Sequence, residues 1–304
     1  MCKVVVAGSL NYDIFLTLPA VPKVGETASA SSSKSAAGGK GANQAVQIAK
    51  LGTSVCMVGS VGQDQMGKAL LKSLADAGVD CRKVKEEADL GTGMGIVDVF
   101  PDGSVMAVIS HGANYGVDPA RIFEAEEEIA RARLLVLQLE IPIESVKCAV
   151  DLAAKHGTKV LLNAAPAAKL EDEYIQRCDY FVVNEVEASF YAGEEINSVE
   201  AAEKWLPKLA KKYQNCWICT LGKEGALIAS EDQMYRIPAA KTKAVETTGA
   251  GDSFVGGFCH GLLQGMDLCQ AGNFAACCSG ITIQSVGAQN SMPDREQIQK
   301  EYGI

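Results

Sequence analysis

The sequence predicts an α/β fold in which a central, mostly parallel β-sheet is flanked by helices. Short apolar runs typical of buried strands alternate with longer amphipathic segments along most of the 304 residues. Glycine-rich turns follow several of these runs. Strand–helix alternation of this kind builds a parallel sheet with helices on both faces, and ligands then bind beyond the carboxyl ends of the strands.

The apolar runs expected to form this sheet lie at residues 4–8, 55–61, 134–137, 160–162, 180–183 and 217–221. Helical patterns follow them at residues 41–51, 66–77, 144–155, 185–192, 199–212 and 254–263. The first of these helices is followed by Gly52, a residue that commonly ends a helix. Residues 271–280 are rich in small side chains, which would let a helix pack closely against the sheet or a ligand.

Two segments break the alternation. Residues 13–36 show weak strand periodicity interrupted by prolines, and residues 93–110 are typical of a hairpin with a Pro101-Asp102-Gly103 turn. Neither fits a strand–helix unit. We expect them to pair into a small second sheet that forms a lid over the site, within a single domain of residues 1–304.

Composition excludes several classes of function. The formal net charge is −9, whereas a nucleic-acid-binding protein is expected to present a basic face. No apolar run approaches the ~18 residues that indicate a membrane span, and the segment beginning Met1-Cys2-Lys3-Val4 lacks the apolar core of a signal peptide. We therefore expect a cytoplasmic protein with no nucleic-acid or membrane partner.

The eleven cysteines are interpreted as reduced thiols packed in apolar segments. Cys216 and Cys219 have CxxC spacing, but they fall in a strand-like run whose alternate residues face opposite ways. No second CxxC or histidine pair completes a zinc set. Metal or redox chemistry is therefore not expected at this motif.

The segment from Thr247 to Phe254, TTGAGDSF, carries the clearest chemical signal. Gly249, Ala250 and Gly251 let the backbone approach a ligand, and the N–H groups of the helix that follows favour an anion. Asp252 lies where that anion would bind. A carboxylate beside a phosphate cradle suits a general base that accepts the proton of an incoming hydroxyl, so the pattern predicts phosphoryl transfer.

Two earlier motifs are suited to recognising hydroxyl groups. Asn11 and Asp13 follow a buried strand with a spacing of two, which is also a common turn pattern. The sequence GGKGANQA at residues 38–45 opens a helix and brings Asn43 into its first turn. Glu140 follows another strand and would lie at the same edge of the sheet.

Three further segments bear on nucleotide binding. Asn184 and Glu187 share a helix face, which suits Mg²⁺ held through its waters or a simple helix cap. Residues 220–225 predict a strand, a glycine turn and a second strand, which could contact a nucleotide or form a plain hairpin. Residues 62–68 match GxxxxGK, but the next residue is Ala69, so the hydroxyl that a P-loop needs is missing.

Together these motifs resemble the ribokinase family of carbohydrate kinases. The similarity runs from residue 4 to about residue 293 in family order, and its most specific marks are residues 38–45 and 247–254. It implies a ribokinase-like fold with a small β-sheet lid that also makes a homodimer contact. The implied cofactors are ATP and Mg²⁺, with K⁺ as an activator.

The resemblance also assigns roles to residues. The sugar-hydroxyl set would be Asn11, Asp13, Gly39, Lys40, Asn43 and Glu140. Asp252 would be the catalytic base beside an anion hole of Gly249, Ala250 and Gly251. Nucleotide contacts would come from Asn184, Thr220, Gly222, Gly225 and Gly251, and Glu187 would organise Mg²⁺ through water. The monovalent cation would bind at Glu246, Thr248, Ser285, Gly287 and Ser291.

Two departures from the family pattern bear on these roles. Glu246 replaces the usual aspartate, and its longer side chain could shift or weaken the cation site, so the resemblance leaves K⁺ activation undecided. Ala275 and Ala276 occupy positions where an Asn or His often lies beside the adenine, which allows looser stacking or a broader nucleotide preference.

The resemblance implies ATP-dependent phosphorylation of the primary hydroxyl of a free pentose, D-ribose to D-ribose 5-phosphate above others. No arginine precedes Arg82, so a sugar-phosphate substrate is disfavoured. A nucleoside kinase or a kinase of another unphosphorylated sugar is the alternative, and a catalytically inactive sugar-binding protein is a third reading. A base pocket for a nucleoside could be formed by Tyr12, Phe15, Met94, Phe100 and Met106.

Overall fold

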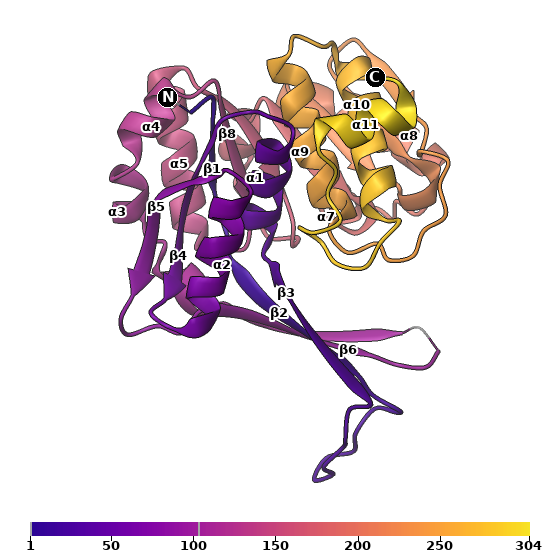
Figure 1. Cartoon of the computed structure of the whole chain (residues 1–304). Helices are drawn as coiled ribbons and strands as arrows, with labels where there is room; N and C mark the ends of the chain where they lie inside the picture. Colours follow the sequence, from indigo (N-terminus) through magenta and orange to yellow (C-terminus); the bar gives the residue numbers. More distant parts are fainter. Residues whose placement is uncertain (1, 103) are drawn as a thin grey trace.

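The computed structural model describes residues 2–102 and 104–304 (Figure 1). Within these residues a nine-stranded sheet forms the centre of the molecule. Across the sheet its strands are β13 (Met234–Ile237), β12 (Ala226–Ala229), β11 (Cys216–Thr220), β10 (Tyr180–Asn184), β9 (Lys159–Asn163), β8 (Leu134–Gln138), β1 (Val4–Ala7), β4 (Val55–Gly62) and β5 (Asp80–Glu87). All neighbours pair in parallel except β12 and β13, so the expected mostly parallel sheet is confirmed.

Helices cover both faces of this sheet. One face packs against α3 (Pro119–Phe123), α4 (Glu126–Arg131), α5 (Ile143–His156), α6 (Asp172–Gln176), α7 (Glu185–Ala192) and α8 (Val199–Tyr213). The other packs against α1 (Lys40–Lys50), α2 (Gln65–Asp76), α9 (Ala250–Leu263) and α10 (Leu268–Thr282), and α11 (Arg295–Tyr302) packs behind α10. The apolar strands are buried on both faces, which explains their continuous hydrophobic runs.

A separate four-stranded sheet extends from this body as an arm (Figure 1). Its strands, in order, are β3 (Ser32–Gly38), β2 (Asn11–Thr17), β6 (Gly93–Val99) and β7 (Val105–Ser110). The expected second sheet is confirmed, although its first two strands begin and end about two residues from the predicted limits. Gly103 of the predicted hairpin turn lies outside the described residues.

The strand β5 and the short helices α3, α4, α6 and α11 were not predicted. Six of the eight residues of β5, DCRKVKEE, are charged, because it is an edge strand with one open side. A charged edge strand lacks the apolar run by which the interior strands were found. The short helices span one or two turns, too few for a helical period to be visible.

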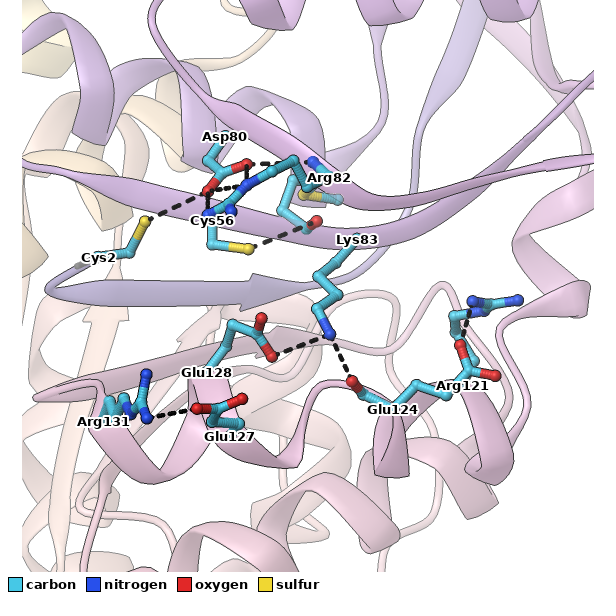
Figure 2. A network of polar contacts seen from close by, with 11 residues as sticks. Cys2, Cys56, Asp80, Arg82, Lys83, Arg121, Glu124, Glu127, Glu128 and Arg131 are labelled. Carbon is cyan, nitrogen blue, oxygen red and sulfur yellow. Dashed lines mark hydrogen bonds and ion pairs between the residues drawn. The ribbon is translucent and has the colours of Figure 1, made fainter.

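Polar contacts tie this edge strand to the helices beside it (Figure 2). Lys83 Nζ donates to Glu124 O at 2.6 Å and pairs with Glu128 Oε2 at 3.1 Å, which links β5 to α4 and the end of α3. Arg82 pairs with Asp80 at 2.6 Å, and the Cys2 thiol also contacts Asp80. Cys2 precedes β1 and Asp80 begins β5, so the contacts among Cys2, Asp80 and Arg82 lie at the amino ends of the strands.

The CxxC pair behaves as its strand position predicts. Cys216 packs into the core on the α9–α10 side, whereas Cys219 packs into the core on the opposite face of the sheet. Burial raises the pKa of the Cys216 thiol to about 12. Within residues 2–102 and 104–304, no group of three or more His, Cys, Asp or Glu side chains is arranged to chelate a metal. No helix in the same residues is long and apolar enough to cross a bilayer.

Candidate active site

The carboxyl ends of the parallel strands gather the polar residues that the sequence singled out. Asn11 follows β1, Glu140 follows β8, Asn184 ends β10, and Thr220, its cross-strand neighbour, ends β11. Two helices, α1 and α9, begin at the same edge and contact one another. Residues from widely separated parts of the chain therefore meet where open α/β sheets bind ligands.

Asp252 lies in the first turn of α9. Its N-cap is Gly249, whose φ of 77° is the left-handed region that favours glycine. Ala250 N donates to Thr247 O at 3.1 Å and closes the turn, and the N–H groups of the first helical turn lack intrahelical acceptors. The turn therefore places backbone donors and the positive end of the helix dipole beside the carboxylate.

Two amides hold the Asp252 carboxylate. Asn43 Nδ2 donates to Oδ2 at 2.9 Å, and Gln44 Nε2 donates to Oδ1 at 2.9 Å. Burial raises the pKa of Asp252, while Lys40 and the two amide donors oppose the rise. The charge of Lys40 and the two amide donors favour the ionised form of Asp252 against the effect of burial.

Lys40 is the cation at the centre of these carboxylates. Burial alone would lower its pKa, but four nearby acidic groups reverse the effect and raise the pKa of Lys40 above its usual value. Those groups are Asp252, Glu140, Glu187 and Asp13. These charges therefore favour the ammonium form of Lys40, which interacts both with the acids on the sugar side and with Glu187 on α7.

Asp13 projects from β2 between two glycines. A Cβ at Gly38 would lie 2.0 Å from its Oδ2, and a Cβ at Gly95 would lie 2.5 Å from its Oδ1, so any larger side chain would displace the carboxylate. Burial raises the pKa of Asp13 to about 6, and the charge of Glu140 adds to the rise. The Asp13 carboxylate thus occupies space that is open because residues 38 and 95 of the flanking strands are glycines.

Asn11 is 4% exposed and is oriented by Asn114, which the sequence did not single out. Asn114 Oδ1 accepts from Leu10 N at 2.8 Å, so its amide cannot be reversed without placing two donors together. Its Nδ2 then donates to Asn11 Oδ1 at 2.7 Å. The amide group of Asn11 is therefore left to donate toward a ligand.

Glu140 is held at its strand end by two donors. Its Oε2 accepts from Ser9 Oγ and, at 3.2 Å, from Lys40 N. Gly39, the N-cap of α1, has a φ of 87° and lies against the backbone of residues 9–11. Glu140, Gly39 and Lys40 are therefore assembled around the end of β1, beside Asn11.

On the nucleotide side, Asn184 and Glu187 form a capping box at the start of α7. Asn184 Oδ1 accepts from the N–H groups of Val186 and Glu187, and Glu187 Oε2 accepts from Asn184 N at 2.7 Å. Burial raises the pKa of Glu187, opposed by the Asn184 hydrogen bond and the charge of Lys40. The hypothesis of a helix cap is thus confirmed, and the charge of Glu187 also interacts with that of Lys40.

The turn after β11 contains the other expected nucleotide contacts. Thr220 ends the strand, and Gly222 begins a short 3₁₀ turn, Gly222–Glu224, at the exposed edge of the sheet. Gly225 differs, because a Cβ there would lie 2.0 Å from Ile237 O of β13. Its position is explained by strand packing. Ala275 and Ala276 lie on α10, and both are buried.

The residues expected around a monovalent cation come from two adjacent segments. Val245 N donates to Ile283 O at 2.7 Å, and Glu246 Oε2 accepts from Gly287 N at 3.1 Å. Ser291 Oγ donates to Val286 O at 3.2 Å. Thr248 and Ser285 lie in the same two segments. The available donors are carboxylate, hydroxyl and carbonyl oxygens, which suit a hard cation.

Comparison with known proteins identifies the family to which the chain belongs. A model of the pfkB family of carbohydrate kinases matches residues 1–295. The chain is 37% identical over 314 residues to a ribokinase of Schizosaccharomyces pombe, covering 100% of this chain and 99% of that one. It is 36% identical over 300 residues to a deoxyribokinase of Salmonella typhi, covering 98% of each. A structure of Arabidopsis thaliana ribokinase complexed with ribose and ATP superposes with a TM-score of 0.93 at 31% identity, covering 99% of this chain and 98% of that chain. The chain therefore belongs to the pfkB family of carbohydrate kinases.

Proposed function

We propose that the protein transfers the γ-phosphate of ATP to the primary hydroxyl of D-ribose, giving D-ribose 5-phosphate. One observation carries this proposal: Asp252 is buried at the start of α9, held by Asn43 and Gln44, and faces Lys40. A carboxylate aimed from a helix N-terminus is the group that phosphoryl transfer to an alcohol requires.

Asp252 would accept the proton of the attacking hydroxyl as the new phosphorus–oxygen bond forms and the bond from the γ-phosphorus to the oxygen shared with the β-phosphate breaks, so that ADP leaves. The N–H groups of Gly249 and Gly251, together with the dipole of α9, would stabilise the charge on the transferred group, while the Ala250 N–H, which donates to Thr247 O, would hold the turn in place. Because phosphoryl transfer proceeds through a loose transition state, alignment and charge stabilisation would supply most of the acceleration. Lys40 would neutralise the anionic groups that meet at this point.

Asn11, Asp13, Gly39, Lys40, Asn43 and Glu140 would hold the sugar. Asp13 and Glu140 accept hydrogen bonds from hydroxyl groups, while the Asn11 amide donates, so a polyhydroxylated ligand satisfies both kinds of group. The four-stranded sheet would close over it as a lid and exclude water. Asn184, Thr220, Gly222 and Gly251 would contact the nucleotide.

Glu187 fits an indirect role toward Mg²⁺. Its Oε2 is engaged by Asn184 N, which leaves Oε1 to accept from a metal-bound water. When bound, Mg²⁺ would neutralise the charge of the phosphate chain. The oxygen donors around Glu246 fit K⁺, with Thr248, Ser285, Gly287 and Ser291 as the other contributors.

The lid favours a sugar over a nucleoside. Tyr12 alternates with Asn11 and Asp13 along β2 and so faces the other side of the sheet. Met94 pairs with Tyr12, and Met106 pairs with Asp98, which places both on that same side. The side chains suggested for a base pocket are therefore divided between two faces.

Deoxyribose is a second candidate acceptor. The similarity to the deoxyribokinase of Salmonella typhi is close to that with the ribokinase of Schizosaccharomyces pombe, at 36% and 37% identity. The two sugars differ by a single hydroxyl group. A site that hydrogen-bonds this hydroxyl rejects the analogue lacking it, because its buried polar groups are then left unpaired.

We also infer that two copies associate through their lids. Met106, Val108 and Ile109 of the edge strand β7 are 43–60% exposed. An apolar edge strand with unpaired backbone groups is a favourable surface for a second copy of the same strand.

Product analysis tests the reaction. The protein is incubated with ATP, Mg²⁺ and either ribose or 2-deoxyribose, and the phosphorylated product is identified by ³¹P NMR. We expect ribose 5-phosphate as the main product. ATP hydrolysis without sugar phosphate, or a phosphate at the anomeric oxygen, would contradict the proposal.

A further inference from the structure

We propose that Gln44 is a positioning residue that fixes the orientation of the Asp252 carboxylate and favours its ionised form. This inference rests on the proposed phosphotransfer at Asp252. Gln44 is 0% exposed, lies one residue after Asn43 on α1, and donates to Asp252 Oδ1 at 2.9 Å. The sequence motif in which it lies, residues 38–45, assigned no role to Gln44.

The hydrogen bonds around Gln44 fix the direction of its amide. An ionised carboxylate only accepts, so Gln44 must present Nε2 to Asp252. The same Nε2 donates to Asn163 Oδ1 at 3.1 Å, and Gln138 Nε2 donates to Gln44 Oε1 at 2.6 Å. Gln138 Oε1 then has no hydrogen-bond partner among the described residues. The buried acceptor Gln138 Oε1 is therefore left without a partner in the described part of the chain, whereas Asp252 keeps both of its donors, Asn43 Nδ2 and Gln44 Nε2.

Asn43 holds the other carboxylate oxygen in the same manner. Gln289 Nε2 donates to Asn43 Oδ1 at 3.1 Å, which directs Asn43 Nδ2 toward Asp252 Oδ2. Gln289 is itself oriented, because its Oε1 accepts from Ser73 Oγ at 2.8 Å. Each oxygen of Asp252 therefore receives one donor whose amide is oriented by a second amide.

This arrangement bears on ionisation as well as on direction. Burial raises the pKa of Asp252, and the charges that face it are Lys40 on α1, which lowers the pKa, and the acids Glu140 and Asp13, which raise it. A donor to the charged form lowers a carboxyl pKa. Removing Gln44 Nε2 should therefore favour the protonated acid, which cannot accept the hydroxyl proton.

Gln47, one turn along the same helix, offers a matched control. It is also 0% exposed and uses both amide atoms, donating to Pro293 O at 2.9 Å and accepting from Ser253 Oγ at 2.8 Å. Ser253 adjoins Asp252 in sequence, yet these bonds do not reach its carboxylate. Gln44→Met and Gln47→Met each remove one buried amide from α1, and only the first removes a donor to Asp252.

The test compares both variants with the unaltered protein in two measurements. The first is the pH dependence of kcat for ribose, and the second is a ¹³C NMR titration of the Asp252 carboxyl carbon without substrate. We expect Gln44→Met to raise the Asp252 pKa and the acid limb of the profile by about one unit or more, the effect of losing one hydrogen bond to a charged group. Below that limb kcat should fall about tenfold per unit, with KM for ribose changed by less than about threefold.

The outcomes separate this inference from the proposed function. If the unaltered protein releases no ADP with ribose, the proposed function fails, and the NMR titration still decides on Gln44. An unchanged Asp252 pKa in Gln44→Met, or an equal shift in Gln47→Met, would overturn the role of Gln44. Should Gln44→Met fail to fold, Gln138→Met removes the donor that orients Gln44, and it is expected to shift the pKa in the same direction. The absence of that shift would also count against the inference.

Discussion

Asn43 and Asp252 lie 209 positions apart in the sequence and are joined by a 2.9 Å hydrogen bond from Asn43 Nδ2 to Asp252 Oδ2. The bond connects the first turns of α1 and α9, the helices that follow the two glycine motifs. Asn43 was expected to bind the sugar directly. In the structure its amide is engaged by Asp252 and Gln289, so it also serves to place the carboxylate.

Replacing Asp252 by Asn should lower kcat by about 10²–10⁴-fold, the usual contribution of a general base. The substitution keeps the size of the side chain but removes the proton acceptor. A coupled assay of ADP release measures the effect. Asp267→Asn is the control, because Asp267 caps α10 and Asn is an equally good cap, so rate and stability should hold. Turnover of Asp252→Asn near that of the control would contradict the assignment.

Asp13 should make stability depend on pH between about 4 and about 6. Its pKa rises from 3.8 to about 6 on folding, because it is buried near Glu140 and Asp252, with Lys40 opposing the shift. The folded state then binds more protons than the unfolded state in this interval. The contribution of this group to the free energy of unfolding therefore falls as pH rises through it.

Asp13→Asn isolates this effect. Above pH ~6 the variant should be more stable than the unaltered protein, and below pH ~4 the difference should vanish. Urea unfolding at several pH values measures both. In kinetics, KM for ribose should increase as pH falls below about 6, because protonated Asp13 accepts hydrogen bonds from hydroxyl groups less well than the carboxylate does. A stability difference that does not change with pH would contradict the assigned pKa.

Asn114→Ala should raise KM for ribose by about tenfold while leaving kcat within about threefold. Without Asn114 Nδ2, the amide of Asn11 is no longer oriented, and the buried Leu10 N–H loses its acceptor. The free energy of unfolding should fall by about 1–3 kcal/mol. Asn215→Ala provides the comparison, since Asn215 is another buried asparagine whose Nδ2 donates to Ile175 O, far along the chain. It should cost stability without changing KM, and equal KM values in the two variants would refute the role of Asn114.

Potassium should activate the enzyme relative to sodium, and Glu246→Gln should reduce the ratio of the two rates to about one. The Glu246 carboxylate accepts from Gly287 N, so it connects the two segments of the expected cation site. Removing its charge weakens attraction for a monovalent cation. ADP release at constant ionic strength in KCl and in NaCl measures the ratio. Equal rates in both salts for the unaltered protein would exclude K⁺ activation.

Val108→Lys should shift the protein toward the monomer at concentrations where the unaltered protein is a dimer. Val108 is 60% exposed on β7, and a charge there opposes association of two apolar edges. Sedimentation equilibrium determines the mass. Val24→Lys is the control, because Val24 is fully exposed outside the strands of the lid. A monomeric unaltered protein, or a dimer in both variants, would contradict association through the lid.

The sequence predicted the parts of the fold that carry strong local signals. Apolar runs such as residues 134–137 located the interior strands, because a parallel sheet buries them on both faces. The charged edge strand β5 gave no such signal. The lid was expected, but its pairing depends on contacts between β2 and β6, which lie some eighty residues apart and share no local pattern.

The same distinction holds at the site. Asp252, Asn43 and Glu140 could be proposed from the sequence because they lie in glycine motifs or at strand ends. Asn114, Gln138 and Gln289 act through partners distant in sequence, and a buried amide cannot be told from any other by its neighbours in the chain. Gln44 adjoins Asn43 in a motif that the sequence identified. Its contact with Asp252 could not be predicted, because that contact depends on how α1 and α9 pack together.

The most direct test of the central claim is kcat/KM measured by ADP release with ATP, Mg²⁺ and a panel of acceptors: D-ribose, 2-deoxyribose, fructose, fructose 6-phosphate, adenosine and cytidine. We predict the highest value for D-ribose, with 2-deoxyribose next and the sugar phosphate and nucleosides far below. A higher kcat/KM for adenosine or cytidine would contradict this account, because three of the five side chains suggested to hold a base, Tyr12, Met94 and Met106, lie on the opposite face of the lid from Asp13.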